Sequence, residues 1–201
     1  MNDTYRTLAQ ISPTLLFKEK KSKFYGIAFP VESEEEIKQH LEDLKRHYSG
    51  AGHFCYAYQL GAENTVYRAN DDGEPNNSAG LPIYGQIQSF QLTNVLVVVI
   101  RFFGGVKLGI GGLISAYKNT AQMVLQEVLI IEKTIDLNYV LTFEYKNLSK
   151  VLRILKEENA TISNQKLELS CEITFLIRKK NAEKLFGIFT SYPEISIKKI
   201  R

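Results

Sequence analysis

The residues of this chain best placed to do chemistry are glycines and cations that follow one apolar run. Residues 95–100, VLVVVI, predict a strand buried on both faces, because the run is continuous and rich in β-branched residues. The glycines that follow it are Gly104, Gly105, Gly109, Gly111 and Gly112. A helical pattern begins after them, and a glycine-rich loop before a helix N-terminus suits an anion, because free N–H groups and the helix dipole favour negative charge. Lys107 and Arg101 add positive charge nearby.

The same glycines also admit a purely structural interpretation. Glycine permits positive φ and close approach of the backbone, which a tight turn between a strand and a helix needs in any case. The loop matches neither the nucleotide-binding pattern G-x-x-x-x-G-K-[ST] nor the dinucleotide-binding pattern G-x-G-x-x-G. The residue types alone therefore leave an anion site and a structural turn as alternatives.

A second distinctive stretch is NDDGEPNNSAG at residues 70–80. Its carboxylates, Asp71, Asp72 and Glu74, could bind Mg²⁺, which takes one or two carboxylates together with phosphate oxygens. The alternative is a polar turn, since Asp, Gly, Asn and Pro are turn formers. A helix is predicted to follow, capped by Ser78 or Asn77.

Two further groups of side chains carry weaker signals. His53 and Cys55 are two residues apart, so they share one face of a strand predicted over residues 53–60. A Cys/His nucleophile pair is one interpretation, and a packed histidine beside a buried thiol is the other. The basic run Lys18, Lys20, Lys21 and Lys23 could contact a phosphate backbone or form a solvated turn.

The elements that would position these residues form two domains. In residues 1–134, a hairpin is predicted around Ser12-Pro13, then a strand over residues 22–31 and a helix that begins at Ser33. In residues 135–201, strands and helices follow the order βαββαβ, the ferredoxin-like pattern. Unbroken alternation of apolar residues over residues 167–177 marks a half-buried antiparallel strand. The predicted fold class is therefore α+β.

Composition narrows the class of protein. The chain has 201 residues, of which 44% are hydrophobic and 23% charged, as in soluble globular proteins. It contains no apolar run long enough for a membrane span, and it begins without a signal peptide pattern. Its two cysteines are far apart in sequence, so a cytoplasmic location is expected. Residues 135–201 hold 12 Lys and Arg against 8 Asp and Glu, so the basic surplus belongs to the C-terminal third.

Four stretches together resemble the Impact/YigZ family, and in particular its bacterial two-domain members. They are KKSKF (20–24), HFCYAYQLG (53–61), DDGEPNNSAGLPI (71–83) and RFFGGVKLGIGGLISAY (101–117). The resemblance covers residues 18–130, and the remainder is similar to the small C-terminal domain of bacterial members. One departure is Asn76-Asn77-Ser78, where the family usually has Ser-Gly-Thr.

The resemblance implies a fold and a setting. It implies an N-terminal domain similar to domain IV of elongation factor G, with a left-handed βαβ crossover, and a C-terminal domain similar to domain V. Sterics alone predict a right-handed crossover. Eukaryotic members act in translational control through an extra partner-binding domain. The sequence begins directly at the family domain, so that partner function is not expected here.

Two hypotheses about function remain open on the sequence. The first is a nucleic-acid- or ribosome-binding protein that uses Lys107, Arg101 and the glycine loop against phosphate, with translational regulation as its setting. The second is an enzyme that acts on a phosphorylated or nucleotide-like substrate, with Asp71, Asp72 and Glu74 as Mg²⁺ ligands or acid/base groups. A protein partner is a third option, and no membrane partner is expected. We also expect the stretch with Asp71, Asp72 and Glu74 to lie beside the Gly104–Gly112 loop and to form one cleft with it, because these two stretches make up most of the family signature.

Overall fold

The computed structural model describes residues 3–200, which divide into two compact units. Tyr5–Lys133 form one, called here the N-terminal unit, and residues 134–200 with Asp3 and Thr4 form the other, the C-terminal unit. Up to residue 134 the elements are β1 (Thr4–Leu8), β2 (Leu15–Glu19), β3 (Ser22–Pro30), α1 (Glu34–His47), β4 (His53–Leu60), β5 (Val66–Asn70), α2 (Gly80–Ser89), β6 (Val95–Phe102), α3 (Gly109–Glu127) and β7 (Ile130–Thr134). Among the described residues, no helix is both long enough and apolar enough to cross a membrane.

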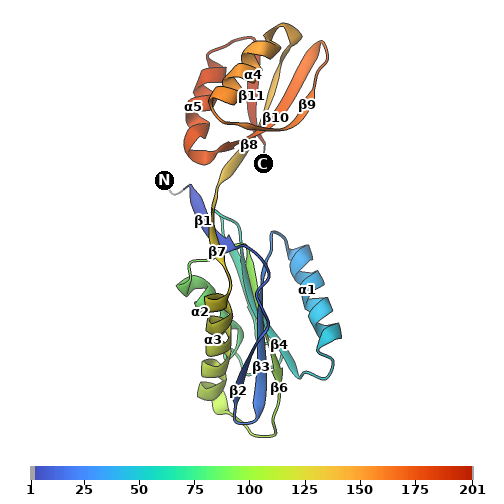
Figure 1. Cartoon of the computed structure of the whole chain (residues 1–201), viewed down its shortest axis with the longest axis vertical. Helices are drawn as coiled ribbons and strands as arrows, with labels where there is room; N and C mark the ends of the chain where they lie inside the picture. The colour runs from blue at the N-terminus through green and yellow to red at the C-terminus, as the bar shows by residue number, and fades with distance from the viewer. Residues whose placement is uncertain (1–2, 201) are drawn as a thin grey trace. The chain divides into compact units, whose positions relative to one another are not determined.

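A five-stranded antiparallel sheet forms the centre of the N-terminal unit. Its strand order is β2-β3-β6-β4-β5, so β6 lies in the middle with β3 and β4 on either side. Helix α1 covers one face of this sheet, and α2 and α3 cover the opposite face (Figure 1). Two apolar cores result, one on each side of the sheet.

Strand β6 separates the two cores. Val95, Val97 and Val99 pack with α2 and α3, and the residues that alternate with them, Leu96, Val98 and Ile100, pack with α1. All six side chains are fully buried, which confirms the prediction of a strand buried on both faces. Because both faces of β6 are covered, the packing holds the strand in place. The start of the loop that follows Phe102 is therefore held in place as well.

The hairpin predicted around Ser12-Pro13 is wrong. Strand β1 pairs with β7 in a separate two-stranded sheet, and β2 pairs with β3. A hydrogen bond of 2.9 Å from the Ala9 N–H to the Leu129 carbonyl joins the residue after β1 to the residue before β7. Local alternation of residue types cannot distinguish this pairing, across more than a hundred residues, from a local hairpin.

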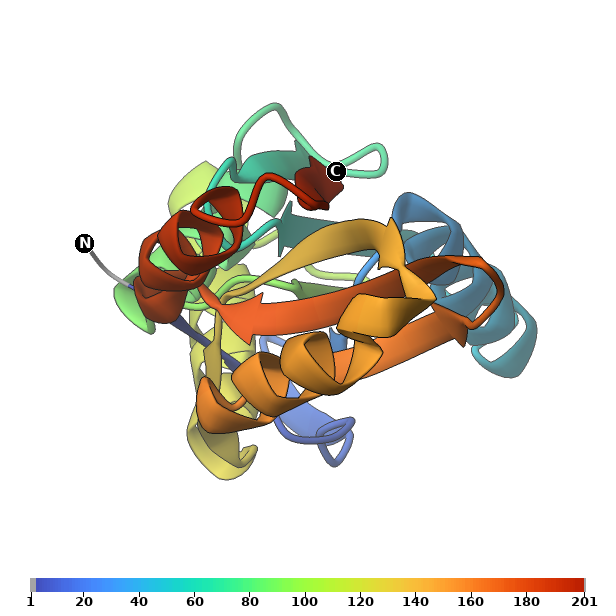
Figure 2. The ribbon, with the colours of Figure 1, turned by 90° about the horizontal axis from the view of Figure 1, so that it is seen from above.

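The C-terminal unit has the predicted ferredoxin-like order. Its elements are β8 (Asp136–Glu144), a short 3₁₀ helix η1 (Tyr145–Asn147), α4 (Leu148–Glu157), β9 (Thr161–Lys166), β10 (Ser170–Arg178), α5 (Lys179–Thr190) and β11 (Ile195–Ile200). The strands form one antiparallel sheet in the order β11-β8-β10-β9. Helices α4 and α5 pack on the same face of it, against alternate residues of β8 and β10 (Figure 2).

Candidate functional site

A cleft of about 420 Å³ lies where β6 ends and α3 begins. Its floor includes Glu74 and Arg101, which are 8% and 5% exposed. Its rim includes Phe103, Lys107 and Ile110, all of them exposed. Glu74 comes from the acidic stretch and Lys107 from the glycine loop, so the structure brings parts of both stretches around one cleft.

The N-terminus of α3 opens on this cleft. The helix begins at Gly109 after Leu108, and no side chain in the described part of the chain forms a capping hydrogen bond to it. The first N–H groups of a helix have no partner within the helix, so here they are available to a ligand. Lys107 precedes the helix by two residues and is exposed, so a positive side chain accompanies these N–H groups.

Different local constraints explain why glycine occupies each position of the loop. Gly105 and Gly109 have φ values of +82° and +76°, which disfavour other residues. Gly104 has another constraint, because a Cβ there would lie 2.1 Å from the Lys21 carbonyl carbon and oxygen. Gly111 has open space around it and no positive φ. The turn interpretation thus explains Gly104, Gly105 and Gly109, and it leaves Gly111 without a structural reason.

A buried ion pair forms the floor of the cleft. Arg101 Nη1 donates to Glu74 Oε1 over 2.7 Å, and the Tyr117 hydroxyl donates to the same oxygen over 2.7 Å. Burial raises the pKa of Tyr117, so its hydroxyl keeps the proton that it donates. Because Glu74 balances the charge of Arg101, Lys107 is the cation that remains available to a phosphate among the described residues that line the cleft.

The guanidinium of Arg101 is held by aromatic rings as well. Its central carbon lies 5.5 Å from the centroid of the Phe24 ring and 5.4 Å from that of Phe103. Its Nη2 approaches the Ser22 hydroxyl at 3.4 Å. Its Nε is buried and has no hydrogen-bond partner among the described residues. The group is therefore fixed in orientation, and its Nε–H is a donor without a partner among the described residues.

His53 also lines the cleft, with about a quarter of its side chain exposed. Its Nδ1 lies 2.7 Å from the Asp72 carbonyl oxygen, which can only accept, so Nδ1 carries the proton. Its Nε2 lies 3.9 Å from Glu74 Oε1. Cys55 follows on the same face of β4, but it is fully buried and its thiol donates to the Asp71 carbonyl. Burial raises the pKa of Cys55, which disfavours the thiolate that a nucleophilic cysteine needs, so the packed-thiol interpretation fits this residue better.

The three carboxylates of the acidic stretch do not converge on one point. Asp71 accepts hydrogen bonds from the N–H groups of Asn77, Ala79 and Gly80, at 2.8 to 2.9 Å, and so caps α2 from outside the helix. Asp72 accepts from the Phe54 N–H over 2.6 Å. The described residues contain no group of three or more His, Cys, Asp or Glu side chains suited to a metal ion. Both oxygens of Asp71 and Oδ2 of Asp72 already accept backbone hydrogen bonds, so the three carboxylates are not placed as ligands of one Mg²⁺ ion.

Capping of α2 also differs from the expectation. The helix begins after Ala79, and neither Ser78 nor Asn77 caps it. The Ser78 hydroxyl donates instead to the Pro75 carbonyl over 2.6 Å. The carboxylate that caps the helix belongs to Asp71, several residues earlier, which sequence patterns of capping do not include.

Asn77 stands where the family usually has glycine, and the backbone conformation at this position explains why asparagine fits. Its φ is +62°, in the left-handed region where asparagine is the most readily accommodated residue after glycine. We expect Asn77→Ala to lower the free energy of unfolding by about 1 kcal/mol, and Asn77→Gly to leave it nearly unchanged. Urea unfolding of both variants measures this. Equal losses in both would show that the asparagine side chain, and not the backbone conformation, matters here.

Phe103 also borders a second hollow, of about 250 Å³, on the side of the β2–β3 hairpin. Lys21, Lys23 and Tyr25 contribute to this hollow. Lys21 and Lys23 belong to the basic run that the sequence singled out. They line a hollow that shares the Phe103 ring with the cleft. An exposed ring between two hollows with lysines around it can contact both the bases and the backbone of a nucleic acid.

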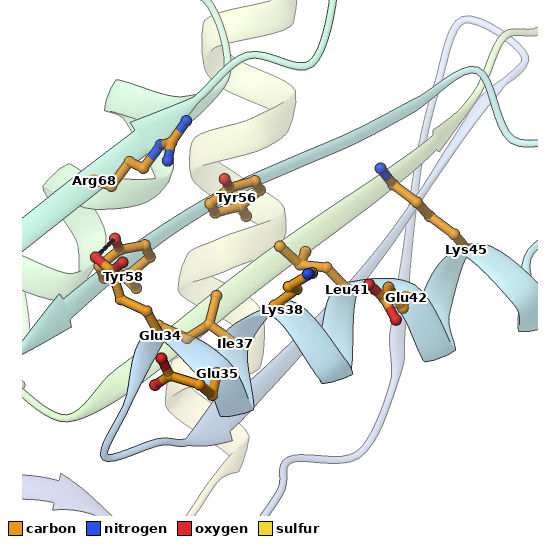
Figure 3. A pocket seen from close by; sticks show the side chains of 10 residues that line it. All are labelled: Glu34, Glu35, Ile37, Lys38, Leu41, Glu42, Lys45, Tyr56, Tyr58 and Arg68. Atoms are coloured by element: carbon orange, nitrogen blue, oxygen red, sulfur yellow. Dashed lines mark hydrogen bonds between the residues drawn. The ribbon is translucent and has the colours of Figure 1, made fainter.

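A larger groove, of about 580 Å³, lies between α1 and the β4–β5 side of the sheet (Figure 3). It carries three acidic side chains and three basic ones, so it offers no net charge to an anion. The Tyr58 hydroxyl donates to Glu34 over 2.6 Å, and burial together with this bond raises the pKa of Tyr58 to about 12. None of the residues that the sequence singled out for binding lies in this groove, which makes it a control surface.

Comparisons with known proteins agree with the motifs. The family described as the Impact N-terminal domain matches residues 20–125, which include every residue that lines the cleft. The IMPACT family member YvyE of Bacillus subtilis is 33% identical over 138 residues, 69% of this chain and 64% of the relative. The chain thus matches slightly less than two thirds of that relative. The IMPACT family member YigZ of Escherichia coli is 30% identical over 160 residues, 78% of either chain.

A solved structure extends the likeness to the whole fold. A crystal structure described as that of a hypothetical protein superimposes with a TM-score of 0.76, over 100% of this chain and 99% of the other. The two sequences are 23% identical, so this likeness concerns the fold alone.

Proposed function

Since this chain belongs to the Impact family, we propose that its N-terminal unit binds single-stranded RNA, with one backbone phosphate at the N-terminus of α3. The choice of RNA follows from the translational role that the family resemblance implies. Ribosomal RNA is one source of such a strand. The proposal thus places the chain in translational regulation as a binding protein.

One observation carries the proposal. The N-terminus of α3 lacks a side-chain cap and opens into a cleft whose rim holds Lys107 and the exposed ring of Phe103. Helix N–H groups and a lysine hold phosphate without reading sequence, and an aromatic face stacks on any base. The additional lysines of the β2–β3 hairpin lie on the other side of the same ring, so a strand that crosses Phe103 meets positive charge on both sides.

The enzyme hypothesis has less support. It assigned Mg²⁺ ligation or acid/base chemistry to Asp71 and Asp72, whose carboxylates already accept hydrogen bonds from backbone N–H groups. Replacing Asp71 by Asn, which could have separated binding from catalysis, would weaken the cap of α2 and so confound any assay. The tests therefore use Lys107, which is exposed and has no structural role in the part of the chain described.

The first test is a salt titration with Lys107→Ala. We expect this variant to bind a fluorescein-labelled 12-nucleotide single-stranded RNA more weakly than wild type, by a similar factor for any sequence. The slope of log K against log [salt] should become shallower by roughly 0.7, the value for one phosphate contact on a single strand. Fluorescence anisotropy at several salt concentrations measures both quantities.

Lys38→Ala is the matched control, because Lys38 is an exposed lysine in the groove beside α1. It should leave both affinity and slope at the wild-type values. Binding that does not depend on salt, or equal effects of the two substitutions, would place the nucleic acid away from the cleft. Wild-type protein without affinity for any RNA would refute the proposal.

A further inference from the structure

We infer that the floor of the cleft holds one unstacked nucleobase that carries an exocyclic amino group, recognised by Glu74 and Arg101. This inference rests on the proposed function and adds base selectivity to it. The phosphate site at the start of α3 and the floor belong to the same cleft, so one nucleotide can reach both.

The first observation is an unused acceptor. Both hydrogen bonds to the Glu74 carboxylate, from Arg101 and from Tyr117, end on Oε1. No hydrogen bond from a described residue reaches Oε2, although the side chain is only 4% exposed. Oε2 is not among the buried side-chain atoms that lack a partner, so it keeps contact with solvent and can accept a hydrogen bond from a ligand that supplies an N–H group.

The second observation is an unused donor. Three buried polar side-chain atoms have no hydrogen-bond partner among the residues described, and they are Arg101 Nε, Asn138 Oδ1 and Asn147 Nδ2. Such atoms are rare in folded proteins and call for an explanation. Arg101 lines the cleft, whereas the other two belong to the C-terminal unit. The floor thus combines an accessible acceptor, Glu74 Oε2, with a neighbouring guanidinium whose Nε donor has no partner among the described residues.

The chemistry of the bases selects among them. Adenine, cytosine and guanine each place an amino group near a ring nitrogen or carbonyl that accepts, so they can donate to Glu74 and accept from Arg101. Uracil also offers a ring N–H beside a carbonyl, but a second carbonyl oxygen flanks that N–H on its other side and would face the carboxylate, which repels it. The volume of about 420 Å³ lies within the range of roughly 300–1,000 Å³ typical of ligand clefts. Phe103 offers a ring face to the same base.

The test changes the ligand, so it does not depend on the folding of a variant. Wild-type protein is titrated with eight-nucleotide oligouridine, with oligomers that carry one adenosine, and with oligomers that carry purine riboside at the same position. Purine riboside keeps the adenine ring and lacks the 6-amino group. We expect the adenosine oligomer to bind at least about tenfold more tightly than either of the others. Equal affinity for adenosine and purine riboside would overturn the inference and leave the proposed function intact.

Two variants test whether the floor of the cleft causes the preference for adenosine over purine riboside. Glu74→Gln should abolish the preference for adenosine over purine riboside, because an amide can present a donor where the carboxylate only accepts. Lys107→Ala should weaken binding of every oligomer and keep the ratio, because it affects the phosphate contact. A ratio that is unchanged in Glu74→Gln, measured on protein whose thermal melt shows it to be folded, would overturn the assignment. If no oligomer binds wild-type protein, the proposed function itself fails.

Discussion

Arg101→Met should lower the free energy of unfolding by about 3–5 kcal/mol, one of the two largest losses expected for any single substitution in this chain. The substitution leaves the Glu74 carboxylate buried with the Tyr117 hydroxyl as its one remaining hydrogen-bond donor among the described residues. It also removes the cation that packs between the Phe24 and Phe103 rings. Urea unfolding followed by circular dichroism measures the loss.

A double-mutant cycle separates the ion pair from other effects of the substitution. Glu74→Met alone should cost a similar amount, because it leaves the Arg101 guanidinium buried and unpaired. The double variant should cost clearly less than the two single losses together, since neither charge is then stranded. Additive losses would show that the two side chains do not stabilise each other.

Gly104→Ala is the second substitution with a large expected effect. A Cβ at this position would lie 2.1 Å from the Lys21 carbonyl carbon and oxygen, and 2.5 Å from the Ser22 nitrogen. These are backbone atoms of the β2–β3 hairpin, so the hairpin or the loop must move. We expect a loss of at least about 3 kcal/mol, at the upper end of what overpacking costs.

Gly111→Ala is the matched control for this prediction. Gly111 lies in the first turn of α3, where an added Cβ would meet no neighbour within 4 Å, and its φ is not positive. Alanine should therefore stabilise the protein, by up to about 1 kcal/mol. Thermal unfolding of both variants tests the contrast. A Gly104→Ala protein as stable as wild type would mean that the loop and the hairpin do not pack as closely as described.

Local patterns predicted much of the fold. The apolar run of β6 and the apolar side of α3 follow directly from residue types. The alternation over residues 167–177 gives β10, but the strand begins at Ser170, and Leu167 and Leu169 are exposed before it. The pairing of β1 with β7 did not follow, because nothing in either segment indicates a partner so distant in sequence. Likeness to the domains of elongation factor G, and the left-handed crossover, stay predictions from the family resemblance.

The candidate site was predictable only in part. The acidic stretch and the glycine loop could be singled out by residue type, but the role of each carboxylate depends on the fold. Asp71 caps a helix and Glu74 is buried against Arg101, and a turn-like sequence contains no sign of either. Tyr117 of α3 packs in the apolar core, yet its hydroxyl donates to Glu74. Such a contact appears only once β6, α3 and the acidic stretch are placed together.

Nuclear magnetic resonance of the amide groups in the first turn of α3 tests the central claim most directly. The protein is labelled with ¹⁵N and titrated with single-stranded RNA at low salt. The proposed function predicts that the amide signals of Gly109, Ile110 and Gly111 shift first and most, together with those around Lys107, and that added salt reverses the shifts. Shifts confined to the groove beside α1 or to the C-terminal unit, with the amides of Gly109–Gly111 unmoved, would contradict it.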